Sequence, residues 1–564
     1  MTDSTQDALL DAWLRVRIQG TLTLRTPLVL KNGAARAGHK LKDGTIPEVM
    51  EVLRTRDGRA AIPGSSLKGV LRSEIERLGG AFASEAVLDV LFGRRSAEKA
   101  DGEGAPDQGR GGSVEFGFAL SKEKLVDPDD AIEHVVAIDR VRHAAADRLL
   151  FATETIPTGT VFDVCLTGYG LSREHVTVLL STLERFNDTR RPLALGSATA
   201  SDYGRAEWVA TSVMTLSADD LAKWTETPAD QPLPDVWSVA QQHPPESFVA
   251  GESARAGKSL DIDVTLAMDG WFLVRDPRQS KAIPPRSNSQ RGDNQKPPDA
   301  LPRCVLNNGV PHVALPARSV RGVLRSQVER IARTLAPRAN VKPGPLVDDS
   351  GSPAQSLVAA LFGGVGGRTA LSVDTFIDPH PAEEIIVEDE AITSFEYPAL
   401  PPGKTTLWQR EFVAVDRFTG GAAEQLKFNC RAAWKPQLKG TLSIDLDDLN
   451  ERCKAIRKKS GQDLSPAAAL GLFLLALRDL NEGDLSFGMG AAKGWGRAED
   501  ALLRASVDDN VATSLEELAG GAPSGLPRPT GAFQLFDDAW FRAIAQSCVR
   551  AAREQLPTEA GATP

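Results

Sequence analysis

The sequence has few cysteines and histidines and no long hydrophobic run. Its five cysteines are odd in number and scattered, no C-x-x-C occurs, and the seven histidines form no metal-ligand spacing with them. A zinc site is therefore not expected, and a reduced, cytoplasmic environment fits. No apolar stretch approaches the roughly 18 residues that suggest a membrane span. The opening MTDSTQDALLDAW lacks the basic and apolar regions of a signal peptide, so neither a membrane nor export is expected.

An excess of positive charge is also missing. The 65 Lys and Arg residues stand against 75 Asp and Glu residues, which gives a net charge of −10. A broadly basic surface for nucleic acid is excluded, so any RNA must bind in a local groove of an acidic protein. The length of 564 residues and the 41% hydrophobic content are typical of a globular chain with more than one domain.

The sequence does contain a long internal repeat. The segment IPGSSLKGVLRSEIERL at 62–78 returns as LPARSVRGVLRSQVERI at 315–331. Three further blocks recur in the same order: LDVLFG as VAALFG, AIDRVRHAAADRLLF as AVDRFTGGAAEQLKF, and LALGSATASDYGRAEW as LSFGMGAAKGWGRAED. Four matched blocks in one order indicate a tandem duplication of one domain. The spacing between copies grows from 253 (Lys68 to Arg321) to 292 (Gly204 to Gly496), so the second copy carries insertions.

The pattern of elements predicts the domain boundaries and the fold. We expect a first module at 1–215, a Pro-rich linker at 216–258, a second module at 259–505 and a tail at 506–564 with an amphipathic helix. Each module reads as strand, helix, strands, helix, Gly-rich turn and strand. This order predicts an α+β fold of the ferredoxin-like kind, with helices on one face of an antiparallel sheet. The tail helix has no counterpart in the first copy, and docking on its own body is favoured over docking on another protein.

Both repeated helices place two cations near the helix start. A Pro and a Ser that can cap the helix are followed by apolar residues at helical spacing. The other face carries Lys68 and Arg72 in one copy, and Arg321 and Arg325 in the other, at i and i+4. The helix dipole disfavours cations there unless an anion such as phosphate is bound. Two interpretations stay open: solvated basic faces or phosphate sites.

The Gly-rich blocks do not form a nucleotide-binding loop of a known type. GMGAAKGWG follows a helical pattern and leads into a strand, whereas a Rossmann or P-loop needs a strand, then glycines, then a helix. One interpretation is a flexible glycine hairpin. The other is a loop whose exposed backbone lets an RNA strand approach, with Lys493 or Arg205 nearby.

Taken together, IPGSSLKGVLRS, the LFG block, the IDR block and the closing G-x-G-x-x-x-G-x-G-R resemble the RAMP superfamily of CRISPR-associated proteins. The likeness is greatest to the backbone subunits of type III effector complexes, and two modules in one chain resemble the double-backbone fusions of type III-D systems. The second copy departs in reading LPARSVRG for the Gly-Ser-Ser form. The first copy has fewer glycines in its closing block.

The resemblance implies an RRM-like palm that binds crRNA and a thumb hairpin that wedges the guide–target duplex. Its implied partners are crRNA, target RNA and other CRISPR effector subunits. Because the aromatic-rich strand of ordinary RRM domains is absent, backbone contact rather than base stacking on the sheet is expected. Segments 122–136, 277–300 and 380–412 are expected as RNA-side loops or thumbs that order in the complex. The RNA-binding residues implied are Ser65, Ser66, Lys68, Arg72, Arg140, Ser319, Arg321, Arg325, Arg417 and Lys493. For Asp139–Arg140 and Asp416–Arg417, a local ion pair is the open alternative.

The resemblance also implies an RNA-guided endoribonuclease whose cleavage residue is a loop aspartate after the first strand. Asp43 and Asp299 fit this position, with Asp57 and Asp293 as rival assignments. Such an aspartate could hold a divalent cation, magnesium or manganese, or accept the proton of the RNA 2′-hydroxyl. A non-catalytic crRNA scaffold is the alternative. A small-molecule nucleotide enzyme is disfavoured, because no phosphate loop, metal cluster or nucleophile–base pair is present.

Overall fold

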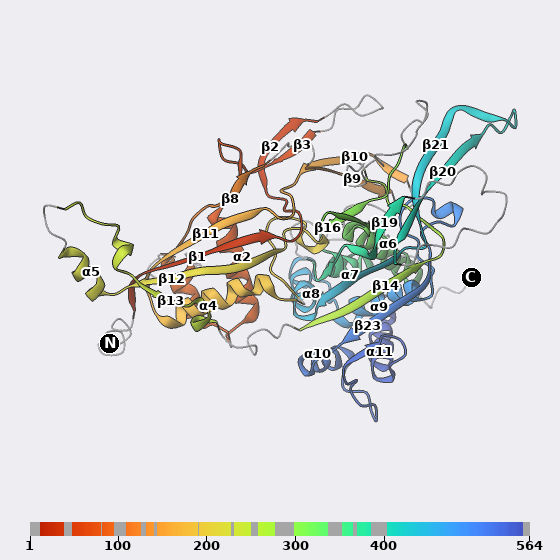
Figure 1. Ribbon diagram of the computed structural model, residues 1–564. Helices are drawn as coiled ribbons and strands as arrows, with labels where there is room; N and C mark the ends of the chain where they lie inside the picture. The colour runs from red at the N-terminus through yellow and green to blue at the C-terminus, as the bar shows by residue number, and fades with distance from the viewer. Residues whose placement is uncertain are drawn as a thin grey trace. The chain divides into compact units, whose positions relative to one another are not determined.

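The chain folds into two compact units (Figure 1). A computed structural model describes residues 12–38, 48–80, 82–94, 109–125, 131–139, 144–189, 191–226, 231–249, 258–276, 298–336, 352–364, 369–384 and 403–556. The first unit comprises Met1–Glu133, Phe151–Thr199 and Tyr203–Gly257, and the second comprises His134–Leu150, Ala200–Asp202 and Lys258–Pro564. The division follows the two repeats except at the two short segments 134–150 and 200–202, which group with the second unit.

The sheet of the first unit has the ferredoxin-like arrangement. Its elements are β1 (Trp13–Leu24), α2 (Gly64–Leu78), α3 (Glu85–Phe92), β8 (Ala119–Lys124), β11 (Val161–Leu171), α4 (Arg173–Glu184) and β12 (Ala206–Leu216). The strands lie in the order β12-β1-β11-β8, with each neighbouring pair antiparallel. The first strand is therefore central, between the last and the third, as the repeated strand–helix order predicts. A four-stranded sheet of β2 (Lys31–Ala37), β3 (Glu48–Val52), β9 (Ile132–Asp139) and β10 (Ala144–Glu154) accompanies it.

The second unit repeats this arrangement. Its elements are β14 (Ser259–Met268), α6 (Ala317–Leu335), α7 (Pro353–Phe362), β19 (Phe376–Glu384), β22 (Gln437–Asp445), α8 (Leu446–Ser460), α9 (Pro466–Asn481) and β23 (Ala498–Ser506). The order β19-β22-β14-β23 again places the first strand between the last and the third. The predicted α+β fold with two tandem modules is confirmed.

Hydrophobic periodicity explains why these elements form. In β1, Val16 and Ile18 are buried while Arg15 faces outward, which is the two-residue period of a strand. In the repeated helices, Leu67 and Leu71 of α2 are buried, as are their counterparts 253 positions later in α6. Each fully buried aliphatic side chain of this size contributes roughly 1.5–3 kcal/mol. The apolar face of each helix therefore fixes which side its cations occupy.

Most of the predicted linker belongs to the first unit. It contains α5 (Ala218–Thr225), η3 (Val236–Val239), β13 (Gln241–His243) and η4 (Pro245–Phe248). Strand β13 pairs with β12, and Phe248 is fully buried in the core of this unit. The Arg17 guanidinium lies over the ring of Trp237, 4.0 Å from its centroid. The prolines mark short loops, but Trp237 and Phe248 supply apolar anchors that hold the segment on the sheet.

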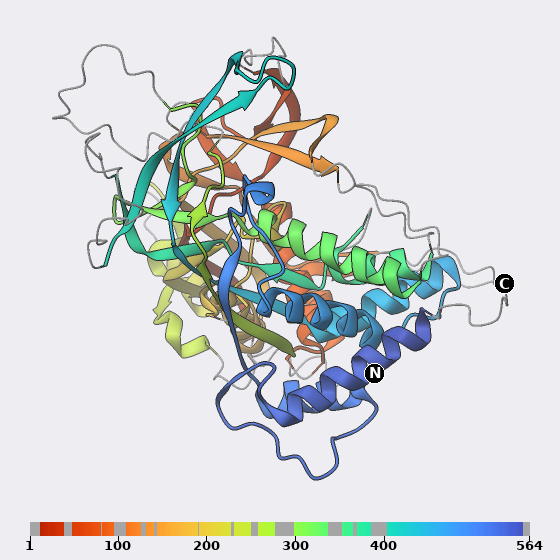
Figure 2. The same cartoon turned by 90° about the vertical axis from the view of Figure 1, so that its right-hand side faces the viewer.

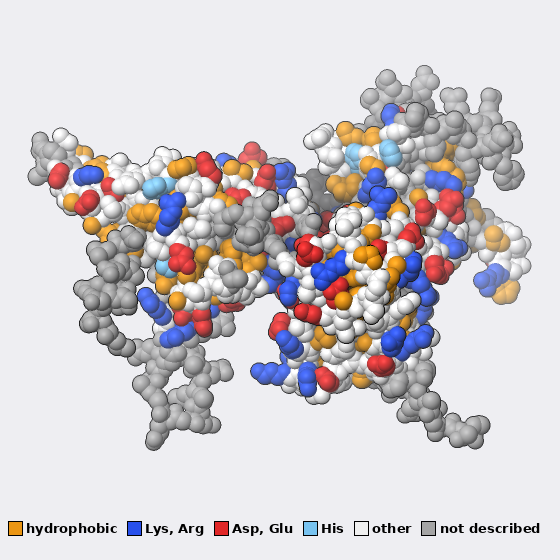
Figure 3. All heavy atoms as spheres, turned by 90° about the horizontal axis from the view of Figure 1, so that it is seen from below, with side chains coloured by type: hydrophobic (Ala, Val, Ile, Leu, Met, Phe, Trp, Pro, Cys, Tyr) orange, Lys and Arg blue, Asp and Glu red, His pale blue; other side chains and the backbone are white. Residues whose placement is uncertain are grey.

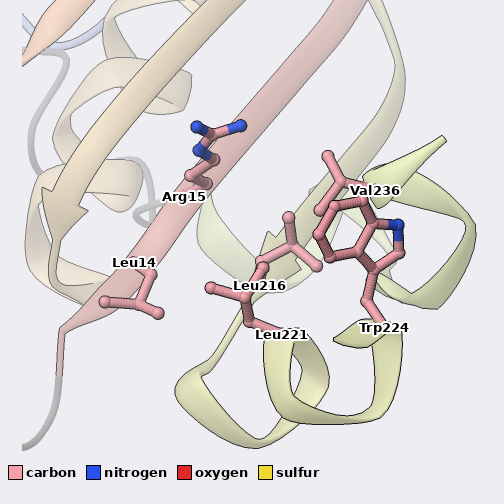
Figure 4. A pocket seen from close by; sticks show the side chains of 6 residues that line it. All are labelled: Leu14, Arg15, Leu216, Leu221, Trp224 and Val236. Carbon is pink, nitrogen blue, oxygen red and sulfur yellow. The ribbon is translucent and has the colours of Figure 1, made fainter. Parts of the chain in front are cut away.

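The segment 216–249 and the sheet of the first unit line an apolar pocket of about 380 Å³ that is open to solvent (Figure 4). Leu14 and Arg15 of β1 form one side of its lining. The remaining wall comes from Leu216, Leu221, Trp224 and Val236. The Trp224 indole nitrogen donates a hydrogen bond to the carbonyl of Pro234, which fixes the ring at the pocket edge.

The C-terminal tail folds onto the second unit. Helix α10 spans Asp509–Ala519 and α11 spans Ala539–Gln555. One face of α11, which includes Trp540, Phe541 and Ile544, is buried in the core, and the helix packs along α9 (Figure 2). The two helices pack so closely that a Cβ placed on Gly471 would lie only 2.2 Å from the carbonyl oxygen of Cys548. The expected self-docking of this helix is observed.

Two further findings concern the cysteines and membrane contact. All five cysteines are free thiols, and only Cys165 is exposed. Among the helices that the structure describes, none has the length and apolar character needed to span a membrane.

Candidate nucleic-acid interface

The two repeated helices begin in the same way, and serine does not cap either of them. Pro63 and Pro316 occupy the N-cap positions, neither provides a side-chain cap, and no acidic residue lies in either first turn. Ser65 and Ser66 thus lie inside the first turn of α2, and Ser319 inside that of α6. The proline fixes the chain direction before the helix, so the serine that the sequence suggested as a cap is displaced inward. An uncapped helix start without acidic residues is compatible with anion binding.

The four helix-start cations differ in how they are used. Arg72 donates to Glu76 at 2.7 Å and to the carbonyl oxygen of Gly93 at 3.0 Å. Arg321 donates to the carbonyl oxygen of Phe362, which ends α7. Burial, together with the nearby Arg325 charge, lowers the pKa of Arg321 to about 10, so it stays charged at neutral pH. These two arginines tie their helix to the end of the next one.

The remaining two cations are less alike. Arg325 donates to Glu329 at 3.1 Å and is mostly shielded from solvent. Lys68 is half-buried on the cationic face of α2, and among the described residues it makes no ion pair. Lys68 is therefore the helix-start cation with the most freedom to reach an external phosphate.

The Gly-rich blocks form two packed loops of the same conformation, here named the first closing loop (193–205) and the second closing loop (485–497). Each closes with a matched bridge, Ala194 to Arg205 and Ser486 to Arg497. A Cβ on Gly204 would lie 1.9 Å from the Leu195 carbonyl oxygen, and the corresponding distance at Gly496 is 1.8 Å. These glycines serve close backbone packing at positive φ rather than flexibility.

A long hairpin extends from the second unit. It consists of β20 (Thr405–Val415) and β21 (Ala422–Trp434), here named the second hairpin. At its tip the Asp416 carboxylate accepts hydrogen bonds from the amides of Phe418 (2.8 Å) and Thr419 (3.4 Å), and these bonds lower the pKa of Asp416. The Asp416 carboxylate thus caps the turn. Arg417 is exposed beside it, and the Phe418 side chain is 101% exposed.

The corresponding segment of the first repeat is β9 and β10, which bracket the first DR motif. Strand β9 ends at Asp139 and β10 begins at Ala144. Arg140, a predicted RNA contact, lies outside the described residues. Of the predicted thumb segments, 277–297 and 385–402 also lie outside them. The part of 380–412 from Thr405 onward forms β20, so the sequence located one arm of the second hairpin.

Asp299 lies beside the second hairpin. Its backbone amide donates to Asn429, to the carbonyl oxygen at 2.9 Å and to Oδ1 at 2.8 Å. Its carboxylate accepts a hydrogen bond from the Asn429 amide at 3.1 Å. The next residue, Ala300, bridges Cys430 of the same strand. Asp299 is half-buried, so its carboxylate is held in place with part of its surface in solvent.

The other candidate aspartates divide into two groups. Asp43 and Asp293 lie outside the described residues. Asp57 lies in the turn before β4 (Arg59–Ile62), where its carboxylate accepts from Thr55 at 2.5 Å and from Arg59 at 2.9 Å. The Thr55 hydrogen bond, with Arg59, lowers the pKa of Asp57. Asp57 therefore acts as a turn residue.

Two cations lie along the second hairpin. Arg410 is paired with Cys430 in the hairpin register, and its guanidinium carbon lies 4.7 Å from the centroid of Trp271. The Lys493 ammonium lies 3.6 Å from the ring centroid of Phe412, two residues beyond Arg410 on β20. Burial raises the pKa of the Cys430 thiol to about 11, while the charges of Arg410 and Lys493 act to lower it. Lys493, predicted from the sequence, belongs to the second closing loop. The sequence did not predict Arg410 as a site residue. Alternation along a strand indicates which side chains face outward, but it does not indicate which residues they contact.

The described residues contain no group of three His, Cys, Asp or Glu that could form a metal cage. A site with one carboxylate is still compatible with magnesium, which is commonly held by one or two carboxylates, substrate phosphates and water. On the face shown in Figure 3, basic and acidic side chains are interspersed.

The family model of the RAMP superfamily matches residues 21–207 and 305–499. These two regions coincide with the two ferredoxin-like repeats. No curated protein sequence matches the chain.

Proposed function

This chain belongs to the RAMP superfamily, whose members are CRISPR-associated RNA-binding proteins, and we propose that it is a crRNA-binding backbone subunit of a type III effector complex that cleaves guide-complementary RNA. The observation that carries the proposal is that Asp299 is hydrogen-bonded to Asn429 of the second hairpin, next to the Arg410–Cys430 pair, and that Lys493 lies over Phe412 of the same hairpin. These residues lie along the middle of the hairpin, and its tip exposes Phe418 completely. The hairpin thus has a carboxylate and two cations along its strands and an apolar side chain at its tip.

The repeat supports a role along the guide. Two copies of one fold would each contact one segment of the RNA backbone, through groups that carry no base specificity. The uncapped starts of α2 and α6 would bind phosphates through backbone amides. Lys68 would add charge in the first repeat. Sequence would then be read by base pairing between guide and target, as in other RNA-guided effectors.

The chemistry that we propose is cleavage by the RNA's own 2′-hydroxyl. The hairpin tip would splay the strand so that the 2′-oxygen lies in line with the scissile phosphorus. The 2′-oxygen–phosphorus bond forms and the phosphorus–5′-oxygen bond breaks, which leaves a 2′,3′-cyclic phosphate and a 5′-hydroxyl. Asp299 accepts the 2′-hydroxyl proton, water supplies a proton to the leaving oxygen, and Arg410 and Lys493 stabilise the charge on the phosphate. In the alternative role, the Asp299 carboxylate would hold a divalent ion, magnesium or manganese, together with phosphate oxygens; the ion would stabilise the same charge, and water would accept the 2′-hydroxyl proton.

The experiment uses the full chain in complex with a guide RNA and a paired target. Asp43→Asn and Asp299→Asn should each remove one metal-dependent fragment and leave the other. Asn keeps an oxygen that can accept the Asn429 amide hydrogen bond, so the hairpin should remain folded. Asp57→Asn is the matched control, and it should leave all fragments in place. If both single variants retain every fragment, the assignment of the two aspartates fails.

The second candidate is a non-catalytic scaffold with the same partners. The observation in its favour is that the Asp299 carboxylate already accepts the Asn429 amide, a bond that also has a structural use. A wild-type complex that binds paired target but yields no fragments with magnesium or manganese would favour this scaffold.

A further inference from the structure

The internal repeat continues past the two closing loops. In the first unit, β12 is followed by α5 and then by β13, which pairs with β12. In the second unit, β23 is followed by α10 and then by β24 (Ala532–Gln534), which pairs with β23. The registers agree, because Val213 lies opposite His243, and Ala505, 292 positions after Val213, lies opposite Phe533. Helices α5 and α10 are therefore matched, and the second unit shows how the apolar face of such a helix is covered.

In the second unit, α11 covers the inner face of α10. Val511, Ala512 and Leu515 of α10 are each at most 1% exposed. Trp540 of α11 is as deeply buried, and its indole nitrogen donates a hydrogen bond to the Glu516 carboxylate of α10 at 3.1 Å. An amphipathic helix thus completes this face of the second repeat.

The matched face of α5 is open. Leu221 and Trp224 lie four and seven residues after the N-cap of α5, the positions that Ala512 and Leu515 hold in α10. Helix α5 is described throughout, and none of its apolar residues is buried; Leu221 is 37% exposed. Together with Leu14, which is 46% exposed, Leu221 and Trp224 line the pocket of about 380 Å³ (Figure 4). The pocket thus occupies the side of α5 that a second helix covers in α10.

The chain between the two units is too short to supply this cover. The first unit is described as far as Val249, and β14 begins at Ser259. The nine residues 250–258 lie between them, whereas α11 has 17 residues. A helix like α11 cannot be built from this stretch, which points to a helix that another protein provides.

The charge in the pocket indicates what such a helix carries. Arg15 is the one charged residue of the lining, and it is exposed. Its guanidinium carbon lies 5.6 Å from the ring centroid of Tyr169, and among the described residues it makes no ion pair. A helix that docks in a groove uses apolar residues three and four positions apart. A carboxylate on the partner helix would complement Arg15.

We propose that the pocket between α5 and β1 docks an amphipathic helix of another protein subunit of the effector complex, with an acidic residue beside its apolar face. The inference rests on the proposed function, which supplies the complex. Apolar side chains of the partner helix would contact Leu14, Leu221 and Trp224, and its carboxylate would pair with Arg15. Because the second repeat covers its own helix with α11, each chain would dock one such helix.

The test is photocrosslinking in the complex purified with its guide RNA. The photoreactive residue p-benzoylphenylalanine replaces Leu221, and mass spectrometry identifies the peptide to which it becomes joined. We expect a peptide of a different protein subunit, with apolar residues at helical spacing and an Asp or Glu among them. The control places the same photoreactive residue at Asp219, which lies about 200° around α5 from Leu221 and should not give this product.

Two substitutions test the contacts. Leu221→Ser should weaken retention of that subunit on dilution of the complex about 10- to 150-fold, which corresponds to about 1.5–3 kcal/mol for one buried leucine side chain. Arg15→Glu should also weaken retention, and an Arg in place of the crosslinked partner's acidic residue should restore it. Leu526→Ser, at an exposed leucine of the second unit, is the matched control and should change nothing. A thermal melt of each variant checks that the first unit remains folded.

The other occupants of the pocket would give different products. A product that joins position 221 to residues 1–11 of the same chain, to a second copy of the chain or to RNA would overturn the inference. A complex that carries RNA but gives no product from position 221 would overturn it as well, while the proposed function would stand. If the purified chain carries neither RNA nor other effector subunits, the proposed function fails and the inference fails with it.

Discussion

Ala198 and Gly490 occupy matched positions of the two closing loops, and both have a left-handed backbone, with φ of 62° and 86°. The next matched pair, Asp202 and Gly494, behaves in the same way, with φ of 65° and 77°. For a residue with a Cβ this conformation costs roughly 1–2 kcal/mol. The first closing loop therefore keeps the conformation of its glycine-rich counterpart at a cost in backbone strain.

Replacing Ala198 by glycine should stabilise the first unit. Relief of the left-handed strain of roughly 1–2 kcal/mol is partly offset by the roughly 0.4–1 kcal/mol of extra unfolded-state entropy that glycine brings. We expect the free energy of unfolding to rise by about 0.5–1 kcal/mol in urea titrations. The control is Ala200→Gly, within the short helix Thr199–Ser201, which has no such strain and should become slightly less stable. Equal effects of the two changes would contradict the strain argument.

Acid should destabilise the first unit through Glu74. Burial by itself would raise the pKa of this carboxyl, but hydrogen bonds from Arg77 and the charges of Arg77, Arg185 and Arg191 hold the pKa at about 2. Because the folded pKa lies below the ordinary 4.5, the stabilisation is present above pH 4.5 and is lost as pH falls toward 2. At about 1.4 kcal/mol per pH unit this amounts to roughly 3 kcal/mol.

Glu74→Gln should show this contribution directly. The neutral side chain removes one of the two carboxylates that pair with the buried Arg185 and leaves Asp188 as the other, so we expect a loss of about 3 kcal/mol at pH 7 and a much flatter pH dependence below pH 4.5. The second repeat carries Gln327 at this position, bonded to Asp479. The control is Glu76→Gln, whose exposed pair with Arg72 should change stability by no more than about 0.5 kcal/mol. Unchanged acid sensitivity in Glu74→Gln would refute the assignment.

Lys68 and Arg321 hold the same place in the repeat and should respond differently to removal. Lys68→Ala should weaken binding to guides of any sequence and reduce the slope of log affinity against log salt by about one, for one lost phosphate contact. Arg321→Ala should instead lower the melting temperature of the second unit, because its guanidinium holds the end of α7. Lys454→Ala, at an exposed site, is the control for charge alone. A loss confined to certain guide sequences would contradict backbone binding.

Phe418 should matter for the duplex and not for folding. Its side chain is fully exposed at the tip of the second hairpin, so Phe418→Ala should leave thermal stability unchanged. We expect weaker binding of paired target, by about 5- to 150-fold if one base step rests on the ring, with guide binding changed less. Leu526→Ala, at another exposed apolar residue of the second unit, is the control. Equal losses for guide and for paired target would argue against a wedge.

The duplication, the α+β class and the cationic faces of the two helices could all be predicted from the order of residues along the chain. These depend on local periodicity and on matched blocks, as in the Leu67–Leu71 face and its counterpart 253 residues later. The sequence located the glycine-rich blocks, but it did not predict the structural role of their glycines. That Gly196 and Gly488 pack against the carbonyl oxygens of Val29 and Leu273 depends on which backbone segment crosses the loop, and no local pattern carries that information.

Which charged groups remain available to a ligand depends on contacts between distant segments. Arg72 and Arg321 looked like phosphate contacts, but the ends of neighbouring helices accept their hydrogen bonds. Arg410 could not be predicted as a site residue from the sequence. The register of the second hairpin places it opposite Cys430, beside the loop that holds Lys493. Charge and period are properties of a segment, whereas burial and partners follow from contacts between segments far apart in the chain. The candidate interface therefore depends on packing more than on motif.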